Sequence, residues 1–321
     1  MVEAEYIPQH EPVLRERVFA LLAPALTEAE PILVDATVGL GGHALFALQQ
    51  LPTLRLIGID RDDRALAVSR ERLAAYESRV TLVHAVYDHI ADVLRELGHP
   101  RVNGILFDLG VSSMQLDDPA RGFAYSRDVA LDMRMDPTTG DTAADIINSY
   151  SERDLARILR TYGEERFASR IARRIVQERA RMPFTTSARL VDVIRESIPA
   201  PARREGGNPA KRTFQALRIE VNDELGILER AIPQALASLT LHGRVVVMSY
   251  QSLEDSIVKS AFTEASRVRV PEDLPIIPDD AQPQFRLVHR GALTADESEV
   301  SENPRAASVR IRALERVRWA A

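Results

Sequence analysis

The stretch Asp35-Ala36-Thr37-Val38-Gly39-Leu40-Gly41-Gly42-His43 decides the fold of this sequence. It begins inside a short apolar run, residues 31–36, and leads into a segment with helical character, residues 43–50. Glycines between a strand and a helix allow a tight turn and let backbone N–H groups approach a ligand. We therefore expect a strand, a ligand-binding loop and a helix here.

A second apolar run, residues 54–59, ends at Asp60, which lies 21 positions after Gly39. A carboxylate at this place can accept both hydroxyls of an adenosine ribose, which predicts a nucleoside at the carboxyl ends of the strands. Gly39-x-Gly41-x-x-Ala44 also fits the dinucleotide fingerprint, so NAD is an alternative, as is a nucleotide-binding module without catalysis. Two observations favour S-adenosylmethionine and methyl transfer. Asp35 and Asp108 stand at the ends of other strands, and no group of residues suited to hydride transfer follows downstream.

Strands and helices alternate over the first third of the chain, with further strands at 80–84 and 103–109. This alternation predicts an α/β fold with a parallel sheet covered on both faces. It stops after Asp108, where a helical insertion is expected. We assign residues 1–120 and 209–321 to a methyltransferase domain and 121–208 to an inserted helical domain that recognises RNA.

Helices are expected from Ser151, over 164–181 and 187–197, and over 213–239, where Pro233 bends or interrupts the last one. Later strands are expected over 243–248, 285–289 and 308–313.

The 321-residue chain has ordinary globular composition and no cysteine, which excludes disulfides, thiolate metal sites and cysteine nucleophiles. We expect no metal site. The first residues carry no signal-peptide pattern, and no apolar run approaches a membrane span. The expectation is a cytoplasmic protein.

The net charge of −6 hides a basic segment. Residues 153–212 contain 15 Arg and Lys against 7 Asp and Glu, a local net of +8. Such a segment can meet RNA phosphates, although solvated arginine faces of amphipathic helices explain it equally well. The best RNA-binding candidates flank Gly206-Gly207-Asn208-Pro209, and they are Arg203, Arg204, Lys211 and Arg212.

Several longer strings occur in order along nearly the whole chain. They are His10-Glu11-Pro12-Val13-Leu14, residues 35–43, Gly58-Ile59-Asp60-Arg61-Asp62, Phe107-Asp108-Leu109-Gly110-Val111-Ser112-Ser113, Gln115-Leu116-Asp117-Asp118, Arg121-Gly122-Phe123, Leu131-Asp132-Met133-Arg134-Met135-Asp136, Tyr162-Gly163-Glu164-Glu165-Arg166-Phe167-Ala168, residues 208–218, Ser252-Leu253-Glu254-Asp255 and Asn303-Pro304-Arg305-Ala306. Together they closely resemble the RsmH (MraW) family of bacterial 16S ribosomal RNA cytosine-N4 methyltransferases.

The resemblance implies a class I, Rossmann-like methyltransferase fold with a helical domain inserted after strand four. It implies methylation, with S-adenosylmethionine, of N4 of one cytidine in the decoding region of 16S rRNA. The substrate would lie in the small ribosomal subunit, and a homodimer is left open. The implied cofactor contacts are Gly41, Gly42, His43, Asp60, Tyr87, Asp108 and Gln115.

Asp108 is also the candidate catalytic residue, because a hydrogen-bond acceptor near N4 would activate a poor nucleophile; the backbone carbonyls of Leu109 and Gly110 are the alternative acceptors. The familiar Asp-Pro-Pro-Tyr loop is absent, and Asp108-Leu109-Gly110-Val111 occupies its place, so Asp108 could instead serve the cofactor alone. Two positions depart from the family: Tyr87 stands where Phe is frequent, and Gln251 where many members have His. The run at 131–136 is either a structural Arg–carboxylate clamp or a substrate contact.

Overall fold

A computed structural model describes residues 11–202, 208–268 and 282–319 of the chain. The chain forms two compact units. The sheet unit comprises residues Met1–Gly110 and Gly226–Ala321, and the helical unit comprises Val111–Leu225. The division expected from the sequence, 121–208, is therefore narrower than the helical unit, because the helix that follows residue 208 buries Phe214 and Leu217 in that unit's core.

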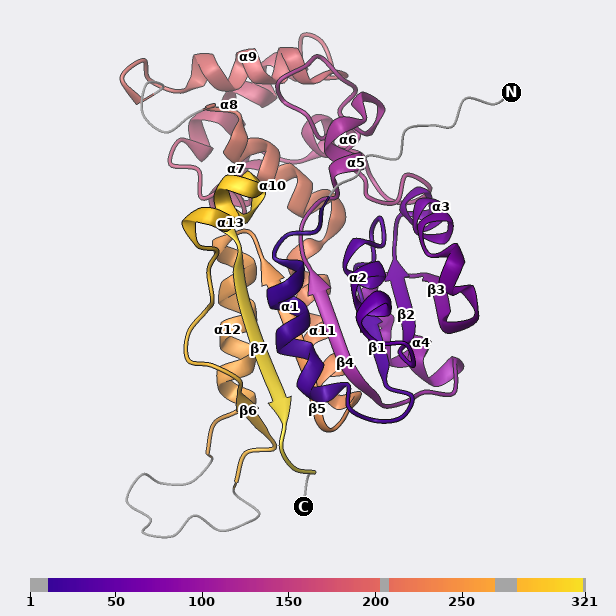
Figure 1. Cartoon of the computed structure of the whole chain (residues 1–321). Coiled ribbons are helices and arrows are strands. Elements are labelled where there is room, and N and C mark those ends of the chain that lie inside the picture. The colour runs from indigo at the N-terminus through magenta and orange to yellow at the C-terminus, as the bar shows by residue number, and fades with distance from the viewer. Residues whose placement is uncertain (1–10, 203–207, 269–281, 320–321) are drawn as a thin grey trace, which may run out of the picture. The chain divides into compact units, whose positions relative to one another are not determined.

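The sheet unit contains seven strands in the order β3-β2-β1-β4-β5-β7-β6 (Figure 1). The first five pair in parallel, and β7 runs antiparallel to both of its neighbours. The strands span Ile32–Asp35 (β1), Arg55–Asp60 (β2), Val80–His84 (β3), Val102–Asp108 (β4), Leu239–Ser249 (β5), Phe285–Leu287 (β6) and Arg310–Arg316 (β7). The alternating strands expected over the first third of the chain are confirmed.

Helices cover both faces of this sheet because successive strand residues point to opposite sides. Leu33, Leu56 and Leu106 pack with α1, α2 and α3, while Val34, Ile57 and Phe107 pack with α4, α11 and α12. These helices span Arg15–Leu22 (α1), Gly42–Gln50 (α2), Asp63–Arg72 (α3), Ile90–Glu96 (α4), Glu224–Ala237 (α11) and Ser252–Ala265 (α12); shorter helical segments are Ala23–Ala25 (η1), Ala74–Arg79 (η2), Tyr87–His89 (η3), Glu297–Glu302 (α13) and Pro304–Ser308 (η7).

The helical unit is built from amphipathic helices around one apolar core. Leu155, Ile171, Phe184 and Ile194 lie in this core, and arginines occupy the outer helix faces. The helices span Ser113–Asp117 (α5), Pro119–Arg121 (η4), Ala143–Ser149 (α6), Glu152–Thr161 (α7), Ala168–Arg179 (α8), Ser187–Ser197 (α9) and Lys211–Asn222 (α10).

The run at residues 131–136 is part of this core. Leu131, Met133 and Met135 are buried in it, and the Asp132 carboxylate accepts two hydrogen bonds of 2.8 Å from the Arg134 guanidinium. The buried Arg121 donates to the carbonyl oxygens of Arg134 and Met135. These contacts favour the structural clamp, one of the two interpretations of this run.

The prediction of a single helix over residues 213–239 is wrong. The structure has two helices, α10 and α11, which are separated at Asp223. The φ of 48° at Asp223 lies in the left-handed region, so the right-handed helix cannot continue through this residue. Pro233 lies within α11 and does not end it, and β5 begins four residues earlier than expected. The helix expected from residue 164 starts at Ala168, because Glu164 also has a positive φ of 48°.

Within the described ranges, no helix combines the length and apolar character needed to cross a membrane.

Candidate cofactor and active site

The glycine loop joins β1 to α2 and has the conformation that its sequence predicts. Gly39 and Gly41 have φ of 50° and 75°, values that L-residues with a side chain rarely adopt. Gly41 is the N-cap of α2, and a side chain added at Gly42 would place its Cβ 3.0 Å from Pro12 Cγ. The loop thus needs its glycines for backbone turning and for close approach, and it leaves the first N–H groups of α2 without side-chain caps.

Asp60 ties this loop to the end of β2. One carboxylate oxygen accepts the Gly39 N–H at 2.8 Å, and the other accepts the Asp62 N–H at 2.8 Å. Burial raises the pKa of Asp60 to about 6, against the effect of these hydrogen bonds. Because each oxygen has two lone pairs, one further hydrogen bond can be accepted on each. The ribose hydroxyls that we expect at Asp60 would use these positions.

Asp35, at the end of β1, is 2% exposed. It accepts the Thr37 N–H at 3.3 Å. Burial raises its pKa to about 7, although the nearby His43 acts in the opposite direction. A cationic group in the loop would favour its ionised form.

Asp108 ends β4, the strand beside β1, and three groups surround it. Its N–H donates to Thr37 Oγ1 at 2.7 Å, and the Tyr250 hydroxyl donates to Oδ1 at 2.8 Å. His43 Nε2 lies 3.6 Å from Oδ2, beyond hydrogen-bond distance. With 28% of its side chain exposed, Asp108 can accept a further ligand.

His43 Nε2 is buried and has no hydrogen-bond partner among the described residues. A buried polar atom without a partner costs free energy, so this nitrogen favours a bound ligand at the glycine loop. Asp60, Asp35 and Asp108 end three neighbouring strands and surround this loop with carboxylates. S-adenosylmethionine is cationic at its sulfonium and its ammonium, so the donor set fits it.

Tyr250 was missed by the sequence analysis, although its hydroxyl binds Asp108 directly. It follows β5 without a gap, so it lies at the same carboxyl edge as Asp35, Asp60 and Asp108. Burial and the Asp108 carboxylate raise its pKa, which keeps the hydroxyl protonated as a donor. A polar residue at the end of each parallel strand is the signal that could have found it.

Two further predicted cofactor residues lie in different units. Tyr87 starts η3 after β3, and its ring packs edge-on against Phe107 at 5.5 Å between centroids. Gln115 lies in the helical unit, where it forms a capping box at the start of α5: its side-chain oxygen accepts the Ser112 N–H at 3.1 Å. Their contacts with the cofactor stay predictions.

The predicted RNA-binding residues are only partly described. Arg203 and Arg204 lie outside the described residues. Lys211 and Arg212 are exposed at the start of α10, and Arg212 also donates to the Glu164 carbonyl oxygen at 2.7 Å.

Gln251, which the sequence analysis singled out as a departure from the family pattern, has a structural contact at the start of α12. It caps α12 together with Glu254, to whose carboxylate it donates a side-chain hydrogen bond of 2.9 Å. The next acidic residue, Asp255, binds Arg310 and Arg312 of β7 at 3.1 and 2.7 Å. The Ser252-Leu253-Glu254-Asp255 string therefore anchors α12.

Comparison with known proteins agrees with this geometry. Residues 8–317 match the family model described as the MraW methylase family. The chain belongs to the MraW methylase family. This membership confirms the methyltransferase class, the Rossmann-like fold and S-adenosylmethionine as cofactor, and the NAD alternative is set aside.

Curated members of the MraW family are similar over their full length. Proteins named ribosomal RNA small subunit methyltransferase H from Nocardioides sp. and Parafrankia sp. are 60% and 61% identical, over 96% of this chain and 97% and 94% of their own lengths. The protein of the same name from Streptomyces avermitilis is 55% identical, over 97% of this chain and 98% of its own length.

Proposed function

We propose that this chain transfers a methyl group from S-adenosylmethionine to the exocyclic N4 of one cytidine in the decoding region of 16S rRNA, within the small ribosomal subunit. The observation that carries the proposal is the full-length similarity to rRNA methyltransferases, combined with a partly exposed carboxylate, Asp108, at the end of β4.

In this proposal the three strand-end carboxylates divide the work of binding. Asp60 accepts the ribose hydroxyls, while Asp35 and the unpartnered His43 Nε2 face the amino-acid tail. When bound, S-adenosylmethionine supplies an electrophilic methyl group. Gly41 and Gly42 leave room for it at the N-terminus of α2.

Asp108 is the residue that we propose to contact the acceptor. Cytosine N4 is a poor nucleophile because its lone pair is delocalised into the ring. A carboxylate oxygen that accepts an N4 hydrogen bond favours a tetrahedral amino group and stabilises the positive charge that develops on it. Thr37 and Tyr250 hold Asp108 in place, so its orientation needs no adjustment during transfer.

The chain has no cysteine, which bears on the site of methylation. Methylation of cytosine at C5 usually proceeds through a cysteine adduct at C6, and that route is closed here. The absence of cysteine therefore favours the exocyclic amino group over C5 as the site of methylation.

Nucleoside mass spectrometry of small-subunit rRNA tests the proposal. Cells that lack the protein should lose one N4-methylcytidine, and purified wild-type protein with S-adenosylmethionine should restore it, whereas Asp108→Ala should not. Detection of 5-methylcytidine alone in the restored RNA would refute both the reaction and the assignment of Asp108.

A further inference from the structure

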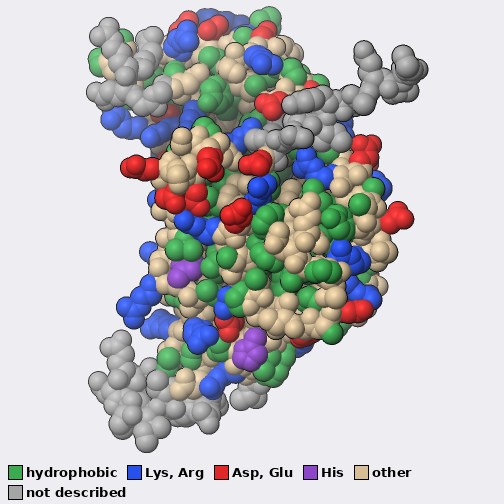
Figure 2. Space-filling model, in the orientation of Figure 1, with side chains coloured by type: hydrophobic (Ala, Val, Ile, Leu, Met, Phe, Trp, Pro, Cys, Tyr) green, Lys and Arg blue, Asp and Glu red, His purple; other side chains and the backbone are tan. Residues whose placement is uncertain are grey.

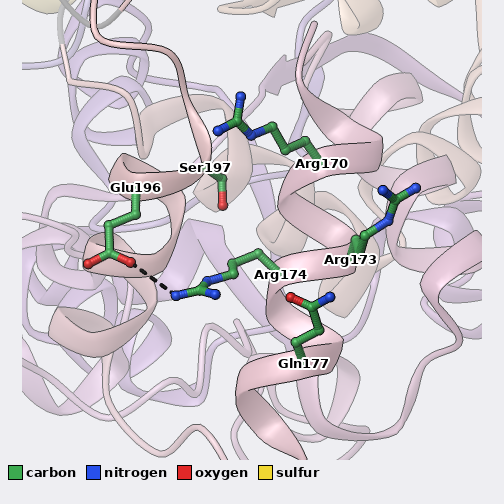
Figure 3. Close-up of a pocket in the computed structure, with 6 residues that line it drawn as sticks. All are labelled: Arg170, Arg173, Arg174, Gln177, Glu196 and Ser197. Carbon is green, nitrogen blue, oxygen red and sulfur yellow. Dashed lines mark hydrogen bonds and ion pairs between the residues drawn. The ribbon is translucent and has the colours of Figure 1, made fainter.

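The helical unit carries an open hollow of about 420 Å³ on the outer faces of α8 and α9 (Figure 3). We call it the arginine hollow, and it is lined by Arg170, Arg173, Arg174, Gln177, Glu196 and Ser197. It lies in the basic segment 153–212 but contains none of the four residues chosen there as RNA-binding candidates.

The arginines of the hollow form one stripe of α8. Arg170, Arg173, Arg174 and Gln177 follow the i, i+3, i+4, i+7 spacing, which brings side chains together on one helix face. The neighbouring stripe of α8 is buried in the core of the unit. The core thereby fixes the helix rotation that presents the guanidinium groups outward.

Two of these three guanidinium groups, those of Arg170 and Arg173, are weakly engaged among the described residues. Arg170 has no ion pair or side-chain hydrogen bond among the described residues. Arg173 lies 3.5 Å from a Glu152 oxygen with 67% of its side chain exposed. Arg174 lies 3.4 Å from the exposed Glu196 and 3.2 Å from Glu178, which is only 15% exposed. The exposed pair of Arg173 with Glu152 contributes little, so Arg170 and Arg173 are the guanidinium groups most available to a better acceptor, while Glu178 holds Arg174 in the lining.

The lining selects one chemical class of ligand. Three guanidinium groups face a single lining carboxylate, Glu196, so the hollow is suited to an anion. Guanidinium forks match phosphate oxygens in pairs. The six lining residues include no aromatic or aliphatic side chain, so the hollow provides no aromatic platform for base stacking and no surface for an apolar peptide or lipid chain.

We propose that the arginine hollow binds the sugar-phosphate backbone of the RNA substrate and positions the RNA without reading its sequence. This inference rests on the proposed rRNA methyltransferase function. Contacts to phosphates fix the register and orientation of a nucleic acid, and the identity of the target base is then read at the active site.

The test compares two double variants of equal charge. Arg170→Gln with Arg173→Gln removes two exposed guanidinium groups from the hollow. The control, Arg55→Gln with Arg95→Gln, removes two that are 52% and 69% exposed in the sheet unit. Arg55 begins β2, at the opposite edge of the sheet from Asp60, so the control leaves the candidate active site intact.

Binding is measured with protein-free small-subunit rRNA at several salt concentrations. The hollow variant should bind on the order of tenfold more weakly, and its salt slope should flatten by about 0.7 for each phosphate that is no longer neutralised. Its affinity for S-adenosylmethionine should equal that of the wild type, and the control should match the wild type throughout. Equal affinities and parallel slopes for the hollow variant would overturn the inference, as would an equally weakened control.

A second arm uses assembled small subunits. Weaker binding of the hollow variant to the subunit but not to free rRNA would overturn the inference in favour of a ribosomal protein contact. Failure of the proposed function is separate, because it would appear as wild-type protein that binds RNA but forms no N4-methylcytidine.

Discussion

Asp60 combines two tasks at the end of β2. It holds the glycine loop through the N–H of Gly39, and it keeps lone pairs available for the ribose. In the proposed binding mode, the position of this one carboxylate determines both the conformation of the loop and the placement of the ligand.

Replacement of Asp60 by alanine should therefore weaken S-adenosylmethionine binding by roughly 1.5 to 3 kcal/mol, the range for hydrogen bonds to charged groups. Calorimetry measures the change. The neighbouring Asp63→Ala serves as control, because it removes a carboxylate that is exposed in the first turn of α3. Unchanged affinity in Asp60→Ala would contradict the ribose contact.

Tyr250 is a positioning residue for Asp108. Tyr250→Phe keeps the ring but removes the hydrogen bond of 2.8 Å, so kcat should fall about tenfold while the affinity for S-adenosylmethionine stays constant. Tyr76→Phe is the control, because the Tyr76 ring lies against Arg79. This variant should leave both kcat and the affinity for S-adenosylmethionine unchanged. If Tyr250→Phe lowered cofactor affinity and left kcat intact, Asp108 would serve the cofactor alone.

Asp35 makes the stability of the cofactor-free protein depend on pH. Its pKa is about 7 in the folded state and near 3.8 when unfolded, so the folded state binds more protons between these values. The free energy of unfolding therefore falls as the pH rises through this window. Asp35→Asn does not titrate, so relative to wild type it should gain roughly 2 to 3 kcal/mol between pH 5 and pH 8.

Urea unfolding at the two pH values measures this gain. Asp60 titrates in both proteins, so the part of its effect that does not depend on the charge of Asp35 cancels in the comparison. A difference between the two proteins that stays constant with pH would show that Asp35 is ionised throughout.

At the scale of elements, apolar runs and their carboxylate ends allowed β1, β2 and β4 to be predicted with the residues that follow them. These strands are buried on both faces, so their sequences are continuously apolar and easy to recognise. The break at Asp223 was missed because no glycine marks it; the only signal in the sequence is that aspartate tolerates the left-handed region better than most residues. Tyr250 escaped because its partner, Asp108, is 142 positions away along the chain.

Two glycines of the helical unit provide a matched pair for testing its loops. Gly122 and Gly140 have φ of 76° and 79°, but a Cβ at Gly122 would lie 2.3 Å from the Ala130 carbonyl oxygen, whereas the space around Gly140 is open. Both alanine variants incur the left-handed strain of about 1 kcal/mol. Gly122→Ala should destabilise the protein by roughly 1 to 3 kcal/mol more than Gly140→Ala.

Thermal unfolding of the two variants measures this difference. Equal melting temperatures would show that the loop after η4 can move away from the added methyl group.

At the scale of the whole molecule, charge is unevenly distributed along the chain. The net charge is −6, yet residues 153–212 carry a net of +8. Figure 2 shows acidic side chains gathered in the region of α13, whose first turn contains Glu297 and Glu299 after Asp296. A basic segment in an otherwise acidic chain favours the proposed contact with RNA at that segment.

The four candidates near residue 208 extend this expectation beyond the arginine hollow. Neutralising Arg203, Arg204 and Lys211 should weaken RNA binding and flatten its salt slope, with cofactor affinity unchanged. Arg212 is excluded from the variant because it supports the Glu164 carbonyl group. Salt titrations against rRNA that superimpose on those of wild type would remove these residues from the RNA-binding surface.

The pairing of β4 with β5 has a consequence for biosynthesis. These neighbours in the sheet are separated by about 130 residues of chain, so β4 leaves the ribosome long before its partner exists. At about 5 to 20 residues per second, the nascent protein would present an unpaired, apolar β4 edge for on the order of ten seconds. An insertion with its own core shortens the effective loop that must close, so early folding of the helical unit would speed the pairing of β4 with β5 once β5 has emerged.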